Sequence, residues 1–260
     1  MNARSALFDL YGDHLLARGG AAPVASLVRL LAPLDIAAPA VRTAVSRMVA
    51  QGWLRPERLT QGPGYRLTPR AEERLSAAAA RVYRTDSPPW DGRWHVLVLD
   101  HIADRARRER VRSALGYLGY ARLRDPTWIS PRPSRELAAL LDAEGITAHQ
   151  FDAAHDGDDA LLAADAWDLD ALAAAYRDWQ RQASALLAQL PRQPSDAAAF
   201  VTRTRLVHEW RKFLFTDPGL PREVLPADWP GDAAAAQFDA ESSRLLPQAA
   251  SYVEGCLGLT

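Results

Sequence analysis

The chain of 260 residues has one cysteine, one lysine and no long apolar run. A single cysteine, Cys256, excludes an internal disulfide and any zinc site built from several cysteines. No apolar segment approaches the roughly 20 residues that a membrane-spanning helix needs, and Met1 to Gly20 shows no signal-peptide pattern. The sequence contains neither a Gly-x-Gly-x-x-Gly or Walker loop nor a Gly-x-Ser-x-Gly nucleophile elbow. We therefore expect a cytoplasmic protein that is not an enzyme, with no cofactor and no contact with a membrane.

Charge is unevenly distributed along the chain, although 31 basic residues nearly balance 32 acidic ones. Residues 1–83 contain 11 arginines and six acidic residues, and residues 84–130 contain nine arginines and six acidic residues. Residues 131–260 contain 11 basic and 20 acidic residues. The net charges are therefore +5, +3 and −9. A basic front and an acidic rear indicate a part that faces nucleic acid, joined to a part with another role.

The first of three expected domains, residues 1–86, shows the element order of a winged helix-turn-helix. Three helices are predicted, the third from Pro39 to Gln51, followed by strands at residues 53–55 and 65–67 and a helix over residues 68–83. The third helix has an apolar back and a polar front that fits a DNA major groove. An ordinary surface helix and hairpin with solvated arginines is the alternative. The candidate DNA-binding residues are Arg42, Thr43, Ser46 and Arg47 on the helix and Arg55, Arg58, Gln61 and Arg66 on the hairpin.

The second expected domain, residues 87–165, alternates strands and helices. Strands are predicted at residues 94–99, 127–129 and 146–151, and helices at 104–118 and 134–143. This pattern fits a ferredoxin-like α+β domain. The third domain, residues 166–260, is predicted to be helical, with a bend near Pro247. The predicted fold class is thus mainly α with α+β, and we expect the second and third domains to form a homodimer.

Three blocks of the sequence resemble the PaaX family, repressors of phenylacetate catabolism. The first block comprises Val41–Leu54 and Tyr65–Thr68; the second comprises Trp90–Trp94, Leu118–Tyr120 and Trp128–Pro131; the third comprises His208–Phe213, Asp217–Pro221 and Leu225–Gly231. They occur in the family's order across nearly the whole chain. The resemblance implies a dimeric repressor that binds a palindromic operator in double-stranded DNA and is released by an aryl-acyl-CoA thioester, typically phenylacetyl-CoA.

An effector of this kind combines phosphates with an apolar acyl group, so its site needs basic side chains beside aromatic walls. One region that offers both is the helix predicted over residues 195–215 with the segment that follows. It carries Arg205 and the candidate effector-binding residues Arg203, His208, Trp210, Arg211, Lys212 and Trp229. A second region is a cleft between domains that Arg93, Trp94 and Trp128 would line. The alternative for both regions is that the aromatic residues belong to the core and the arginines pair with nearby acids.

Two segments contain residues that could bind a metal ion, which would indicate an enzyme instead of a repressor. Asp100 follows a predicted strand and precedes a basic helix, which resembles the small ferredoxin-like nucleases of CRISPR systems, in which such an aspartate holds a divalent metal across a dimer. One carboxylate is a weak basis for a metal site, and we expect Asp100 to be a strand-end residue. The segment His149–Asp159 collects imidazoles and carboxylates at a spacing that matches no known site, so we expect an acidic surface loop. A metal-dependent nuclease and a nonspecific DNA-binding protein are the competing functions.

Overall fold

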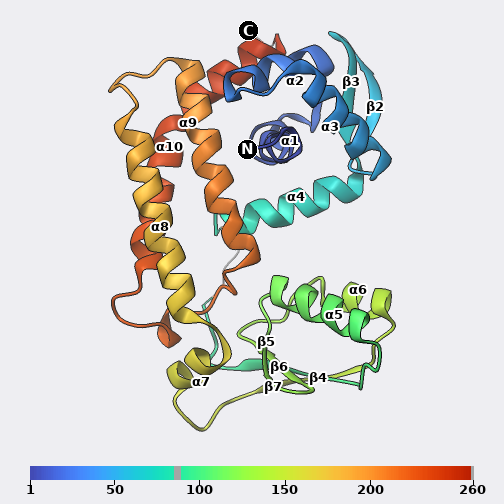
Figure 1. Cartoon of the computed structure of the whole chain (residues 1–260), viewed down its shortest axis with the longest axis vertical. Helices are drawn as coiled ribbons and strands as arrows, with labels where there is room; N and C mark the ends of the chain where they lie inside the picture. Colours follow the sequence, from blue (N-terminus) through green and yellow to red (C-terminus); the bar gives the residue numbers. More distant parts are fainter. Residues whose placement is uncertain (85–88, 259–260) are drawn as a thin grey trace. The chain divides into compact units, whose positions relative to one another are not determined.

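The computed structural model describes residues 1–84 and 89–258 and combines helices with two small antiparallel sheets (Figure 1). The chain folds into two compact units. The first unit contains the described residues of Met1–Asp86, Asp178–Arg211 and Ala234–Thr260, and the second contains those of Ser87–Arg177 and Lys212–Ala233. No described helix is both long and apolar enough to cross a lipid bilayer. The expected division into three domains stays a prediction, and each unit is described by itself.

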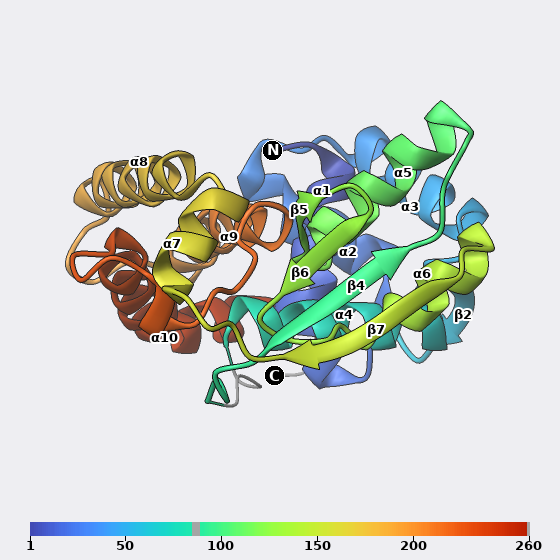
Figure 2. The same cartoon turned by 90° about the horizontal axis from the view of Figure 1, so that it is seen from below.

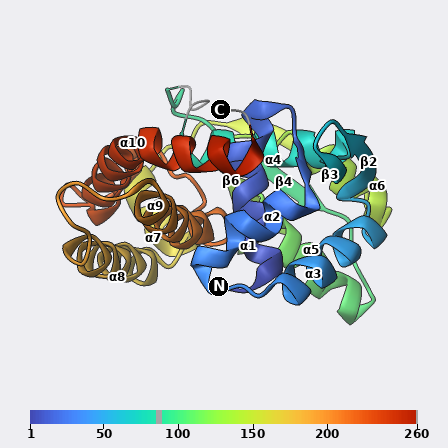
Figure 3. The same ribbon diagram turned by 90° about the horizontal axis from the view of Figure 1, so that it is seen from above.

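The first unit begins with α1 (Ala3–Leu10), which continues through a π-helical turn (Tyr11–Leu15) and a 3₁₀ turn (Leu16–Arg18). Gly19 ends this segment with a φ of +83°, a left-handed conformation that glycine adopts without strain. The following elements are β1 (Ala21–Pro23), α2 (Val24–Leu31), α3 (Ala38–Ala50), β2 (Leu54–Leu59), β3 (Gly62–Leu67) and α4 (Pro69–Val82). The strands form an antiparallel sheet in the order β1-β3-β2. Figure 3 labels two of them, β2 and β3.

The core of the first unit joins residues from both ends of the chain. α9 (Asp196–Trp210) and α10 (Pro230–Leu257) pack with the part of α8 (Leu169–Ala188) that belongs to this unit. On the inner side of these helices, the rings of Trp179, Trp210 and Phe238 lie against one another, with centroids 4.7–6.1 Å apart. Phe200 on α9 and Val253 on α10 enter the same hydrophobic cluster as the buried residues of α1, α2 and α3. The N-terminal helices therefore share their core with the C-terminal helices.

The second unit is built on a four-stranded sheet in which every neighbouring pair is antiparallel. Its elements are β4 (Trp94–Leu99), α5 (Arg105–Tyr117), β5 (Ala121–Arg124), β6 (Thr127–Ser130), α6 (Leu137–Glu144), β7 (Ala148–Ala153) and α7 (Asp159–Ala166). The strand order is β5-β6-β4-β7 (Figure 2). Helices α5 and α6 cover one face, where Leu115 and Leu141 pack into the same cluster as Leu97 of the central strand β4.

Two of the sequence blocks that resemble the PaaX family have structural roles in the second unit. Gly119 has a φ of +89°, and a Cβ atom there would lie 2.9 Å from the carbonyl oxygen of Pro218, so both the conformation and the close approach require glycine. In the block Leu225–Gly231, the carbonyl oxygens of Leu225, Pro226 and Ala227 accept hydrogen bonds from the guanidinium of Arg222 at 2.6–3.1 Å. These contacts fix the backbone of Leu225–Ala227, in the short connector that precedes α10 and has no regular secondary structure.

Candidate DNA interface and effector region

Helix α3 has one buried and one exposed face. Its buried residues Val41, Ala44, Val45 and Met48 follow the spacing i, i+3, i+4, i+7, which places them together against the core. The four predicted DNA-contacting residues of the helix, Arg42, Thr43, Ser46 and Arg47, are all exposed on the remaining surface. Because these residues lie at i, i+1, i+4 and i+5, they form one polar surface along the first three turns of α3.

The side chains of the two arginines of this surface, Arg42 and Arg47, form no hydrogen bond or ion pair with other described residues. Thr43, between them in sequence, donates its hydroxyl to the carbonyl oxygen of Pro39 at 2.9 Å. The guanidinium groups of Arg42 and Arg47 are thus available to bind an external partner such as a phosphate or a guanine edge. No acidic residue occurs within α3 itself.

Of the four predicted DNA-contacting residues on the β2–β3 hairpin, two have free side chains and two lie beside Glu57. Arg58 and Gln61 are exposed near the turn and have no hydrogen-bond partner within the described chain. Arg66, by contrast, pairs with Glu57 across the hairpin, with an Nη2–Oε1 distance of 2.7 Å, and also bonds the carbonyl oxygen of Gly19. The hydrogen bond from Arg66 lowers the pKa of the Glu57 carboxyl. Arg55 lies 3.6 Å from the same carboxylate, so Glu57 partly neutralises the base of the hairpin.

Three of the predicted effector-binding residues are already paired with acids of the first helical segment. Arg203 is 4% exposed and forms an ion pair with Asp13, while its other nitrogens donate to Ser242 and to the Tyr83 hydroxyl at 3.0 and 3.1 Å. The Nδ1 atom of His208 lies 2.7 Å from Oδ2 of Asp9, and Arg211 forms an ion pair with the same carboxylate. These contacts join α9 to the N-terminal helix.

The other three predicted effector-binding residues fall in different parts of the fold. Trp210 is buried, and its Nε1 donates to the carbonyl oxygen of Val82 at 3.1 Å. Lys212 and Trp229 belong to the second unit, where Lys212 is exposed and Trp229 is 8% exposed, its ring 6.1 Å from that of Tyr176. Trp210 and Trp229 therefore have the environment of core residues, and the role of the six residues in effector binding stays a prediction.

The second region considered for the effector is similarly occupied by internal contacts. Trp94 is buried and donates its Nε1 to Oδ1 of Asp159 at 2.7 Å, and Trp128 is buried in the core under α5. Arg93 donates to the carbonyl oxygen of Asp152 at 2.6 Å. These three side chains thus make contacts within the second unit.

The two candidate metal segments show no ligand set in the described residues. Asp100 is exposed at the end of β4, and its backbone N–H donates to the carbonyl oxygen of Thr147 at 3.0 Å. In the segment His149–Asp159, Nδ1 of His155, in the loop before α7, lies 3.3 Å from Oδ1 of Asp159, the first residue of that helix. Within residues 1–84 and 89–258 no group of three or more histidine, cysteine, aspartate or glutamate side chains could hold a metal ion. The nuclease alternative has no support in this geometry.

The sequence pattern missed the acids that organise the interior of the first unit. Asp9 and Asp13 are buried on the first helical segment, beside the apolar stripe to which His14 belongs. Their spacing of one turn was the available signal, since two acids bordering an apolar stripe need buried partners. The partners, Arg203 and His208, lie almost 200 residues further along the chain.

Known proteins match the chain along nearly its whole length. Family models match residues 2–71 (PaaX-like protein), 87–161 (PaaX protein central Cas2-like domain) and 167–255 (PaaX-like protein C-terminal domain). The chain is 29% identical to the Transcriptional repressor PaaX of Escherichia coli strain K12, over 97% of this chain and 83% of that protein. A solved structure, of the uncharacterized protein Rv0674 from Mycobacterium tuberculosis, superposes with a TM-score of 0.62 at 26% identity and covers 96% of this chain and 98% of that one. The chain belongs to the PaaX family.

Proposed function

We propose that this protein is a cytoplasmic, ligand-responsive transcriptional repressor that binds DNA through α3 and the β2–β3 hairpin. The single observation that carries the proposal is the surface of α3, where two unpaired arginines and two hydroxyl side chains lie opposite a fully buried face. We interpret residues 1–86 as a winged helix-turn-helix, with α3 as the recognition helix and the hairpin as the wing. The similarity to the transcriptional repressor of Escherichia coli supports this interpretation.

The proposed docking follows from the dimensions and charge of the elements. An α-helix fits the major groove, where an arginine can contact the O6 and N7 atoms of guanine with two hydrogen bonds. Arg42 and Arg47 are placed for this role or for phosphate contacts, with Thr43 and Ser46 beside them. On the hairpin, Arg58 is the residue best placed to contact the flanking phosphate backbone, because no internal acid holds it.

The second unit supports a role in dimer formation. We interpret it as a ferredoxin-like domain, and its element order βαββαβ with the sheet order β5-β6-β4-β7 supports this interpretation. We propose a homodimer formed through the second and third predicted domains, which presents two copies of α3 to a palindromic operator. In such a dimer the two helices must lie about one DNA turn apart, roughly 34 Å, or a multiple of it.

The proposed effector is an aryl-acyl-CoA thioester such as phenylacetyl-CoA, and the regulated genes are those of aromatic acid catabolism. This part rests on the family resemblance. The ligand needs only to favour a dimer in which the spacing of the two α3 helices no longer matches the operator. A thermal-shift screen of acyl-CoAs tests it: phenylacetyl-CoA should raise the melting temperature, because a ligand bound to the folded state stabilises it, and no shift with any acyl-CoA would contradict it.

Arg42→Ala and Arg47→Ala test the DNA interface. Each variant should bind a specific duplex, selected from a random pool with the wild-type protein, more weakly by about 1–3 kcal/mol, the typical value of a bidentate base contact. A gel-shift or anisotropy titration measures the change, and circular dichroism confirms that the fold is kept. Arg177→Ala, an exposed helical arginine of α8 in the second unit, is the matched control and should bind like the wild type.

The same titrations separate a repressor from a nonspecific DNA-binding protein. A specific repressor discriminates the selected duplex from a scrambled one at every salt concentration. A nonspecific binder loses affinity steeply with salt but binds both duplexes alike. Equal affinity for the two duplexes would contradict the proposed function.

A further inference from the structure

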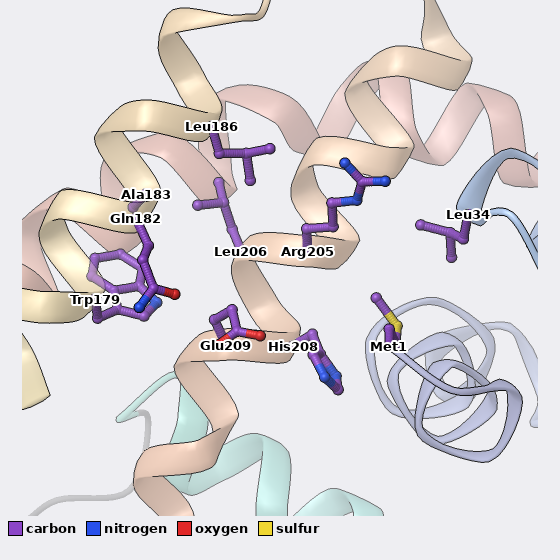
Figure 4. Close-up of a pocket in the computed structure, with 10 residues that line it drawn as sticks. All are labelled: Met1, Leu34, Trp179, Gln182, Ala183, Leu186, Arg205, Leu206, His208 and Glu209. Atoms are coloured by element: carbon purple, nitrogen blue, oxygen red, sulfur yellow. The ribbon is translucent and has the colours of Figure 1, made fainter.

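A pocket of about 360 Å³ lies within the first unit, between the side chains of α8 and α9 on one side and the start of the chain on the other (Figure 4). Its apolar wall is formed by Met1, Leu34, Trp179, Ala183, Leu186 and Leu206. Its polar groups are Gln182, Arg205, His208 and Glu209. All of these residues belong to the first unit. The volume of the pocket lies in the lower part of the range of small-molecule sites, and its lining combines apolar and polar side chains.

Two groups at this pocket lack internal partners. Arg205 is exposed and forms no hydrogen bond or ion pair with any described residue, in contrast to Arg203 and Arg211 of the same segment. The indole Nε1 of Trp179 is buried and has no hydrogen-bond partner in the described part of the chain. Buried N–H donors are nearly always satisfied in folded proteins, and this donor belongs to a side chain that lines the pocket, so a molecule bound in the pocket is one source of the missing acceptor.

These features define the chemistry of the occupant. The wall of leucines and one tryptophan favours an aromatic or branched apolar group. The indole N–H requires an oxygen acceptor, and the free guanidinium requires an anion. A pocket of this volume accommodates a phenylacetyl-sized group but not a complete CoA thioester, so the nucleotide end of such a ligand must extend out of the pocket, past Arg205.

We propose that this pocket binds the acyl group of an anionic aryl-acyl ligand, with Arg205 holding the anionic charge and Trp179 contacting an acyl oxygen. The inference rests on the proposed function, because it places the effector site of the repressor. It differs from the sequence-based prediction, since Arg203 and Arg211 hold the interior together and Arg205 is the arginine that remains free. Two ligands share the required chemistry, a free aryl carboxylate and its CoA thioester.

The pocket is connected to the proposed DNA-contacting helix through α1. His208 lines the pocket, and its Nδ1 is bonded to Asp9 of α1. The buried residues of α1, including Ala6, Leu7 and Leu10, share a hydrophobic cluster with Val41 and Val45 of α3. A ligand that moves His208 therefore acts on α1, and through its packing on the orientation of α3.

Calorimetric titration of the full-length protein without DNA tests the site, with phenylacetyl-CoA, phenylacetate and free CoA as the probes. Arg205→Ala should weaken binding at least tenfold. Ala183→Leu, a separate single variant, fills part of the pocket with a larger side chain and should weaken binding as well. Matched controls are Arg177→Ala and Ala185→Leu; both residues are exposed on α8, away from the pocket lining, and both variants should bind like the wild type. Thermal melts identify any variant that fails to fold, and Arg205→Ala, at an exposed position, is expected to melt like the wild type.

Each outcome decides the proposal. If the binding of phenylacetyl-CoA is weakened by the substitutions at Arg205 and Ala183, the result supports the pocket and identifies the thioester as its ligand. If the same two substitutions weaken the binding of phenylacetate equally, the result supports the pocket with the free acid as its ligand. Binding of free CoA as tight as the thioester, binding unaffected by both substitutions, or no binding of any probe would overturn it. Operator binding of the unliganded wild type is measured in parallel, so that a failed pocket is distinguished from a failed repressor assignment.

Discussion

At the residue scale, the interior of the first unit contains a few buried polar side chains, and His14 is one of them. His14 is 1% exposed, and burial lowers the pKa of its imidazole to about 4 because the charged form is poorly solvated. Asp13 lies 3.2 Å from its Nε2, but this carboxylate is already paired with Arg203. We therefore regard His14 as a neutral residue in the native state at pH 7.

The buried His14 predicts a loss of stability in mild acid. Its native pKa lies below the unfolded value of about 6.5, so the unfolded state binds the extra proton first as the pH falls. The His14 contribution is fully present above pH 6.5 and is lost progressively down to about pH 4, which amounts to about 2 kcal/mol between pH 7 and pH 5. Urea unfolding at several pH values measures it, and in His14→Met this part of the decline should vanish; an identical decline in both proteins would contradict the assignment.

The sequence could predict which residues of the candidate site are exposed better than it could predict how they are used. The helical stripe of α3 correctly separates buried Val41 and Val45 from exposed Arg42 and Arg47. It could not show that Arg66 is held by Glu57 or that Arg203 is buried on Asp13, because both pairs depend on contacts across strands or between distant helices. An arginine side chain pairs with an anion whether that anion is an internal carboxylate or a phosphate of DNA or a ligand. The residue type alone therefore does not distinguish a structural arginine from a binding one.

At the element scale, strongly patterned segments were predicted and weakly patterned ones were missed. The apolar run Trp94–Leu99 became β4 with the predicted bounds, and the helix predicted from Pro39 to Gln51 became α3, Ala38–Ala50. β5 was missed, since its sequence Ala-Arg-Leu-Arg has no apolar run and its strand character comes from pairing with β6. β1 was also missed, because it has only three residues and its strand character comes from pairing with β3.

The different environments of Arg58 and Arg66 on the hairpin predict how the hairpin contributes to DNA binding. Arg58 is free and Arg66 is tied to its base, so Arg58→Ala should weaken DNA binding about equally for specific and scrambled duplexes and reduce the salt slope of the binding constant by about 1. Fluorescence anisotropy at a series of salt concentrations measures both effects. The melting temperature should not change. A loss confined to the specific duplex would place Arg58 on a base edge instead of a phosphate.

At the scale of the whole molecule, the N-terminal helices are not stabilised by residues 1–84 alone. Their hydrophobic cluster includes Phe200 of α9 and Ala249, Val253 and Leu257 of α10. Arg18 pairs with Glu254 at 2.7 Å, and Arg29 donates to the carbonyl oxygen of Cys256 at 2.6 Å. The proposed DNA-contacting helix α3 thus shares one hydrophobic cluster with α9 and α10, so a ligand bound at α9, as proposed above, would have a physical means of affecting α3.

The last prediction concerns this shared core. Phe200 is fully buried, and Phe200→Ala should lower the free energy of unfolding by about 3–5 kcal/mol, the usual cost of removing a buried phenylalanine ring. Because the cluster is continuous, hydrogen exchange should also become faster at the amides of α3, whose own sequence is unchanged. Phe215→Ala is the control: its side chain is 61% exposed in the second unit, and its removal should leave exchange in α3 as it is in the wild type. If Phe200→Ala destabilises α9 and α10 while α3 keeps its protection, the N-terminal elements form a separate folding unit, and the effector must reach DNA by changing the dimer rather than by acting on α1.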